Sequence, residues 1–270
     1  MYNREEVEKE TLNYFNNDEL ATNVWMTKYC LKDKKGNLLE KTPDDMHRRL
    51  AKEFARVEKK FNGLRTMTEE QIFDILKNFD YVVPQGSPMM GIGNNHVNVS
   101  LSNCVVVAPP EDNISSIMDS GKDLANLFKR RCGVGLDLSR LRPENASVNN
   151  SAGTTSGAWS FADLYSYVCR MIGQNGRRGA LMLSMDIRHP DIEQFITMKH
   201  DLSKVTGANV SVKISDEFMK AVENNETFTL KFHIDSDEPT MTKEINAAEL
   251  WGRVVNSATK TAEPGLLMWD

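Results

Sequence analysis

The sequence has little cysteine and no long apolar run. Only four of its 270 residues are cysteine, and they form neither a Cys-x-x-Cys pair nor a spacing typical of zinc ligands. Four thiols in a chain of this length do not build a disulfide scaffold, so we expect a reducing compartment, the cytoplasm. No stretch approaches the roughly 18 apolar residues of a membrane-spanning helix, and the N-terminal MYNREEVEKE lacks the apolar segment of a signal peptide. The sequence therefore predicts no membrane span, no disulfide-rich secreted protein and no metal site.

An excess of positive charge is also missing. The chain has 33 Lys and Arg against 38 Asp and Glu, a formal net charge of −5. Its basic clusters, Lys129-Arg130-Arg131 and Arg177-Arg178, are short and isolated. Such clusters suit small phosphate ligands better than a polyanion, so we expect no nucleic-acid partner.

Residues 1–80 read as a helical region. Thr42-Pro43-Asp44-Asp45 is a typical helix start, with a capping Thr, Pro at the first position and acidic residues in the first turn. Apolar residues then recur at three- and four-residue spacing, and Thr68 begins a second such segment. We expect an all-helical flank.

The amino-acid composition of the sequence changes at Tyr81. Residues 81–100 are rich in Gly, Pro, Asn and Ser and read as a structured loop. Strand and helix signals alternate after it, which favours an α/β fold with mainly parallel strands over 81–270. We expect strands at 101–107, 133–138, 180–185, 209–214 and 227–234, and helices at 114–131, 159–172, 190–199, 217–223 and 247–259.

The last residues, AEPGLLMWD, form an apolar, strand-like run. A domain seldom ends on exposed Leu-Leu-Met-Trp. Either the run packs beneath another segment, or the chain is part of a longer unit, and we expect the second.

Cys104 stands at the head of an apolar run in SLSNCVVVAPPED, residues 100–112. One interpretation is a small buried hydrophobic residue, because free cysteines are commonly buried. The other is a redox or radical thiol at the start of a barrel strand, held by a rigid, buried Val105-Val106-Val107. The residues alone leave both open.

Three glycine-rich stretches could bind phosphate. They are QGSP at 85–88, RRCGVGLDLSRLRP at 130–143 and GQNGRRGA at 173–180. Glycine lets backbone N–H groups approach an anion, and Arg140 and Arg142 are close enough in sequence to bind a polyphosphate. Each stretch could equally be a turn with solvated arginines. His189, before Pro190, is expected to help start a helix.

Taken together and in order, these segments resemble the catalytic large subunit of ribonucleotide reductase. The resemblance covers 81–270 and extends to KYCLKDKKGNLLEKTPDDMHRRLAKE in the helical region. It is closest to the adenosylcobalamin-dependent class II enzymes, with class I large subunits as the alternative. The stretches that carry it are SPMMGIG, LSNCVVVAPPED, KRRCGVGLDLSRLRP, NNSAGTTSG, GQNGRRGALML, HPDIEQFI, VTGANVSVKISDEFM and EPGLLMWD.

The resemblance implies a fold and a reaction. The family fold is a ten-stranded α/β barrel of two half-barrels, so this chain would hold the N-terminal helical region and the first half. The family reduces ribonucleotides to 2′-deoxyribonucleotides, the precursors of DNA, through a thiyl radical and a pair of reducing cysteines. Cys104 matches one of that pair. The pair ends as a redox-active disulfide that thioredoxin or glutaredoxin resets.

The resemblance also assigns substrate contacts. The ribonucleotide diphosphate or triphosphate would lie against Ser87 and the backbone around Asn103 and Gly133. Cys104 would lie below the ribose, and Arg178 over the substrate.

An allosteric effector site follows from the same comparison. The effector, a deoxynucleotide or ATP, would have its ribose held at Asp112, with Glu111 as the alternative because the match needs a one-residue gap. Arg142 matches the effector-phosphate arginine on the first specificity loop. The second specificity loop, which couples effector to substrate, would be formed by Gln174, Asn175, Arg177 and Arg178.

Several family features have no match in this chain. The radical cysteine on the finger loop, its Asn and Glu neighbours and the second redox cysteine match no residue here, and Cys132 and Cys169 are expected to be structural. The ATP-binding cone of many relatives is also unmatched. The chain would therefore need the C-terminal portion of the reductase, with adenosylcobalamin in the class II case or a radical-bearing small subunit in the class I case. A homodimer through helices near the specificity loops is also implied. The alternative is a catalytically inactive nucleotide-binding regulatory module or a remnant.

Overall fold

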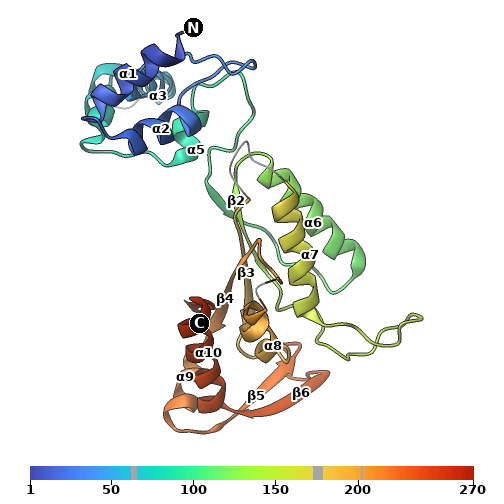
Figure 1. The fold of residues 1–270 in the computed structure, drawn as a ribbon. Helices are drawn as coiled ribbons and strands as arrows, with labels where there is room; N and C mark the ends of the chain where they lie inside the picture. Colours follow the sequence, from blue (N-terminus) through green and yellow to red (C-terminus); the bar gives the residue numbers. More distant parts are fainter. Residues whose placement is uncertain (62–65, 173–178, 202) are drawn as a thin grey trace. The chain divides into compact units, whose positions relative to one another are not determined.

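The computed structural model describes residues 1–61, 66–172, 179–201 and 203–270 (Figure 1). The chain divides into two compact units, residues 1–103 and 104–270. The change of amino-acid composition at Tyr81 lies inside the first unit. The fold class predicted from the sequence is confirmed: a helical N-terminal region is followed by a parallel sheet with helices.

Helices are the main secondary structure of the first unit, and Leu38 adds isolated antiparallel bridges to Tyr2 and Lys32. Thr42 and Asp45 form a capping box, so the long third helix begins at Pro43 as predicted. Its buried face, with Met46, Leu50 and Ala51, packs into a core around Trp25. The helices are α1 (Arg4–Tyr14), α2 (Glu19–Lys28), α3 (Pro43–Glu58), α4 (Glu69–Leu76) with the 3₁₀ turn η1 (Lys77–Phe79), and α5 (Gly86–Gly91).

Helix α5 corrects the prediction that residues 81–100 form a loop. Arg49 of α3 donates to the carbonyl of Met89, 2.9 Å away, and to that of Ile92. These two bonds satisfy carbonyl groups at the C-terminal end of a helix too short to stabilise itself. A tertiary contact, which local composition does not reveal, therefore decides the structure of this segment.

The second unit is built on a five-stranded, wholly parallel sheet in the order β1-β2-β3-β4-β7. Helices follow the strands, as the alternation in the sequence predicted, and five strands is the number that half of a ten-stranded barrel holds. The strands are β1 (Cys104–Val106), β2 (Gly133–Asp137), β3 (Leu181–Asp186), β4 (Asn209–Ile214) and β7 (Gly265–Met268). The helices are α6 (Ile114–Phe128), α7 (Ala158–Met171), α8 (Ile192–Thr197) with the 3₁₀ turn η2 (Met198–His200), α9 (Asp216–Glu223) and α10 (Ala247–Thr261).

The two faces of this sheet differ in composition. Residues paired in register on parallel strands point to the same face. One face is apolar and buried: it includes Leu136, Leu183 and Val210, each at most 2% exposed, in the core of the unit. The opposite face carries small and polar residues, and Val106 on it is 84% exposed.

The strand predicted over 101–107 as a rigid, buried run is wrong in length and burial. Strand β1 has three residues, pairs only with β2 and forms an edge of the sheet. A second difference concerns β5 (Thr227–Phe232), which pairs antiparallel with β6 (Met241–Asn246) outside the main sheet. The central residues of β6, Thr242, Lys243 and Glu244, are polar and exposed, so hydrophobic patterning did not reveal the strand.

Candidate functional site

Cys104 is the exposed thiol of this chain, whereas Cys30, Cys132 and Cys169 are buried. It is the first residue of β1 and lies directly opposite Gly133 of β2. The interpretation of Cys104 as a buried hydrophobic residue is therefore wrong. An accessible thiol at a strand terminus has the exposure that redox chemistry requires.

A cavity of about 600 Å³ opens beside Cys104. It lies at the N-terminal ends of β1 to β4, and its volume falls within the range of small-molecule sites. Small residues keep it open, and its polar lining includes Arg170, Lys199 and Asn209. The small residues of the lining are Gly133, Gly135, Gly179, Ala180, Gly207 and Ala208.

Lys199 had not been predicted as a cavity residue. Its ammonium group donates to the carbonyls of Val205, at 3.1 Å, and Ala208, at 2.6 Å, and lies 3.0 Å from a carboxylate oxygen of Glu263. These two hydrogen bonds and the ion pair hold the segment before β4 near the residues that follow α10. No sequence motif predicts this role of Lys199, because the carbonyl groups that it binds come close to it only in the folded chain.

Ser87 and Asn103, two predicted substrate contacts, lie together in the first unit. The backbone N–H of Ser87 donates to Oδ1 of Asn103 at 2.8 Å, and the Asn103 amide donates to the side chain of Gln85. Ser87 is 3% exposed. The start of α5 is thus held by the residue that immediately precedes Cys104.

Asp112 and Arg142, predicted for an effector, contact each other. Nε of Arg142 lies 2.6 Å from Oδ2 of Asp112, and the backbone N–H of Arg142 donates to Oδ1 at 3.1 Å. Glu111 instead pairs with Arg140 at 2.8 Å, and both side chains are more than half exposed. The Asp112 side chain is 23% exposed and that of Glu111 is 65% exposed, so Asp112 is the more enclosed of the two carboxylates.

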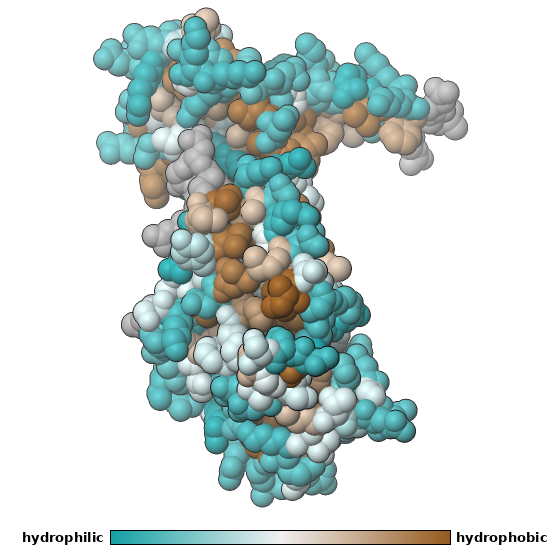
Figure 2. Space-filling model, turned by 90° about the vertical axis from the view of Figure 1, so that its right-hand side faces the viewer, coloured by the Kyte–Doolittle hydropathy of each residue, from teal (hydrophilic) through white to brown (hydrophobic). Residues whose placement is uncertain are grey.

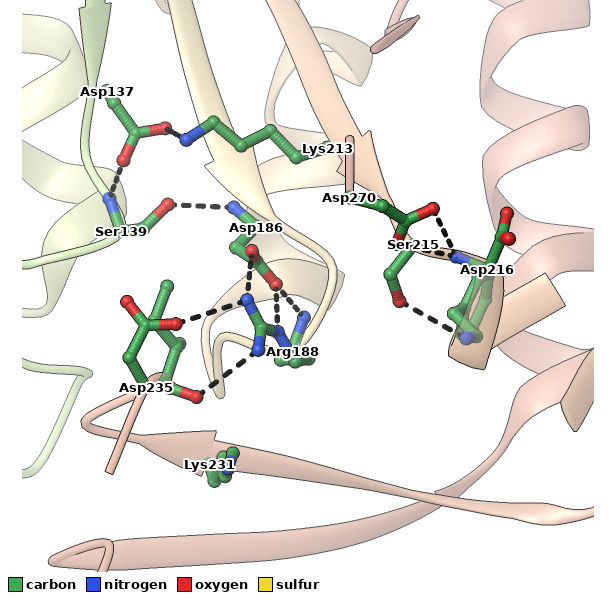
Figure 3. A network of polar contacts seen from close by, with 12 residues as sticks. Asp137, Ser139, Asp186, Arg188, Lys213, Ser215, Asp216, Lys231, Asp235 and Asp270 are labelled. Atoms are coloured by element: carbon green, nitrogen blue, oxygen red, sulfur yellow. Dashed lines mark hydrogen bonds and ion pairs between the residues drawn. The ribbon is translucent and has the colours of Figure 1, made fainter. Parts of the chain in front are cut away.

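A polar network that the sequence reading missed lies at the carboxyl ends of β2, β3 and β4 (Figure 3). Asp137 forms an ion pair with Lys213 at 3.0 Å, across the intervening strand β3. Arg188 reaches from Asp186, at 2.8 Å, to Asp235 near the β5–β6 hairpin, at 3.5 Å. The hydrogen bonds that Arg188 donates to the Asp186 carboxylate raise the pKa of Arg188, so this guanidinium group stays cationic. The network fixes this end of the sheet.

The remaining predicted residues are Gln174, Asn175, Arg177 and Arg178, and they lie outside the described residues.

In the part of the chain that the structure describes, no helix has the length and apolar character to cross a membrane. Nor do three or more His, Cys, Asp or Glu side chains gather there into a group that could hold a metal ion.

Comparison with known proteins gives matches along most of the chain. The family model described as "Ribonucleotide reductase, barrel domain" matches residues 102–270, and that described as "Ribonucleotide reductase, all-alpha domain" matches 15–96. A vitamin B12-dependent ribonucleoside-diphosphate reductase of Mycobacterium tuberculosis is 31% identical over 93% of this chain and 35% of its own length.

Two further relatives have related names. A vitamin B12-dependent ribonucleoside-diphosphate reductase of Thermoplasma acidophilum is 33% identical over 73% of this chain and 25% of its own length. A ribonucleoside-diphosphate reductase subunit alpha of Synechocystis is 31% identical over 62% of this chain and 22% of its own length. The chain thus spans about a third of these relatives or less.

Proposed function

The chain belongs to the ribonucleotide reductase family, and from that premise we propose that it supplies the substrate floor, one reducing cysteine and the effector site of a catalytic subunit. The observation that carries this proposal is Cys104, exposed at the start of β1 beside a cavity lined by glycine. Relatives are named for ribonucleoside diphosphates, so these are the first substrates to test.

The proposed chemistry is a two-electron reduction at C2′ of the ribose. The C2′ hydroxyl leaves as water, and a hydrogen takes its place on the carbon. The two electrons come from two thiols, Cys104 and a cysteine outside this chain, which end joined as a disulfide. Thioredoxin or glutaredoxin then restores both thiols. The family's thiyl radical, which starts the reaction, would also come from outside these 270 residues.

We propose adenosylcobalamin as the radical source, in preference to a radical-bearing small subunit. The support is that several relatives are named vitamin B12-dependent. The cavity beside Cys104 does not fit this cofactor, since its volume suits a nucleoside-sized ligand and a corrinoid with its nucleotide is far larger. We therefore assign no residue of this chain to cobalamin.

We also propose a homodimer through α6 and α7. These neighbouring helices carry exposed apolar side chains, Ile114 and Met118 on α6 and Tyr167 and Met171 on α7, each 56–65% exposed. Figure 2 looks at the side on which α6 and α7 lie in Figure 1, and apolar residues gather there within the second unit. Contiguous exposed apolar surface of this kind marks an interaction site.

The test is substitution of Cys104 in a reductase assembled from this chain and the remaining catalytic portion. Cys104→Ser abolishes thioredoxin-dependent deoxynucleotide formation because an alcohol cannot form the disulfide. Cys132→Ala is the matched control, since that thiol is fully buried and cannot reach substrate. Turnover by the Cys104→Ser enzyme at the control's rate contradicts the proposal. Nucleotide binding without turnover in the unsubstituted assembly would favour the regulatory-module alternative.

A further inference from the structure

The motif His189-Pro190-Asp191 is buried at the start of α8. His189 is 0% exposed and Asp191 is 4% exposed. A role in starting a helix, as predicted, does not require burial of two titratable side chains, which is costly unless each makes specific hydrogen bonds. Both side chains make such bonds, and their partners outside the motif lie between β2 and α7 or at the first residue of α7.

The hydrogen bonds of His189 fix its tautomer. The backbone N–H of Asp191 donates to Nδ1 of His189 at 3.0 Å, so Nδ1 carries no proton. Nε2 therefore carries the proton and donates it to the carbonyl oxygen of Leu141, 2.8 Å away. Nδ1 thus accepts a hydrogen bond at the start of α8, and Nε2 bonds to Leu141, the residue immediately before Arg142.

Asp191 holds the same segment at two further points. Its carboxylate accepts the backbone N–H of Glu144 at 2.9 Å and that of Ala158, the first residue of α7, at 2.8 Å. Gly157 adopts a φ of +91°, and a Cβ there would lie 2.6 Å from Oδ2 of Asp191. Gln194 of α8 adds a hydrogen bond to the Glu144 side chain. The segment 138–157 is thus anchored near both of its ends.

We propose that His189 and Asp191 are positioning residues for the effector site: they hold the segment 138–157 so that Arg142 meets the effector phosphate. This inference rests on the proposed function, which assigns Arg142 to that phosphate. The guanidinium group binds an anion through a planar fork, so small backbone displacements weaken its hydrogen bonds. His189 and Asp191 themselves lie too deep to touch the nucleotide.

Two substitutions of His189 separate positioning from helix initiation. Gln places its amide nitrogen near the position of Nε2 and keeps the bond to Leu141, whereas Asn places its oxygen near Nδ1 and keeps the bond from Asp191. Binding of deoxythymidine triphosphate to the 270-residue chain is measured by titration calorimetry. We expect His189→Asn to weaken binding about tenfold and His189→Gln to stay within about threefold of the unsubstituted chain. The reverse order overturns the inference, since it is the order that helix initiation predicts.

Hydrogen exchange without nucleotide gives a second readout, which does not depend on the proposed function. Positioning predicts faster amide exchange in 138–157 for His189→Asn and for Asp191→Asn, with β3 and β4 unchanged and His189→Gln close to the unsubstituted chain. Equal exchange in the two His189 variants overturns the inference. If the unsubstituted chain does not bind the triphosphate, the effector assignment fails, and with it the inferred role toward Arg142, whatever the exchange shows.

Discussion

At the scale of single residues, the chain itself holds Arg142, a side chain predicted to bind a ligand. Asp112 accepts from both its guanidinium group and its backbone N–H. The family resemblance assigns the two residues to different parts of one effector, and the contact between them supports the effector site that we propose. An anion bound there would share the guanidinium with Asp112, so the carboxylate orients the arginine as well as offering an acceptor to a ribose hydroxyl.

His189 makes stability depend on pH. Burial lowers the pKa of this side chain, although Leu141 and the carboxylates of Asp191, Asp186 and Asp137 oppose the shift. The unfolded chain, with an ordinary histidine pKa of about 6.5, then binds more protons below that pH than the folded chain does. We expect the free energy of unfolding to fall as pH drops below about 6.5.

The measurement is urea unfolding between pH 5.5 and 8 for the chain and for His189→Gln, which does not titrate. His47 in the first unit is also buried with a lowered pKa, and the difference between the two proteins removes its contribution because both contain it. This difference shrinks on acidification and is constant above pH 7.5. A difference that is flat over the whole range contradicts the assignment of a buried, neutral His189.

At the scale of elements, α5 depends on a buried ion pair. Arg49, whose side chain is 10% exposed, lies 2.7 Å from Glu40, whose side chain is 5% exposed. Glu40 also accepts the backbone N–H of Leu31 at 2.8 Å. The same guanidinium bonds the carbonyls of Met89 and Ile92, so one side chain joins three chain segments.

Removing Arg49 alone leaves the Glu40 carboxylate buried and unpaired. We expect Arg49→Met to lower the free energy of unfolding by about 3 kcal/mol. Adding Glu40→Gln removes the stranded charge, so the double variant recovers at least about 1 kcal/mol of that loss. Urea unfolding monitored at Trp25, in the core of the first unit, follows both. A double variant less stable than Arg49→Met would show that the charge pair is not the main interaction.

At the scale of the whole molecule, the parallel sheet buries one face and leaves the other small, polar and partly exposed. Parallel sheets are ordinarily covered on both faces. The exception coincides with the face that bears Cys104 and the cavity, which is the face that the proposed function requires to be accessible.

The proposed homodimer is testable at this scale. Replacing Ile114 and Met118 with Glu places charges within the exposed apolar surface of α6 and α7, where desolvation opposes association. We expect the double variant to be monomeric by light scattering at concentrations where the unsubstituted chain is dimeric. Asn126→Glu, at an exposed position further along α6, is the control and stays dimeric. A double variant that dimerises like the control excludes this surface.

The sequence by itself determined the order and type of most elements, because hydrophobic periodicity, helix caps and glycine signals are local. It also placed Cys104 in a strand and indicated the family, because ordered motifs remain recognisable without coordinates, whereas the start of that strand at Cys104 came from the structure. Only the tertiary structure decided that α5 is helical and that β1 is an exposed edge, since both depend on contacts between distant segments, and that β6 pairs with β5, since its polar sequence carries no strand pattern. The hydrogen bonds of His189 and Asp191 were equally hidden, because their partners lie about 30 to 50 residues away along the chain and become neighbours only when the sheet forms.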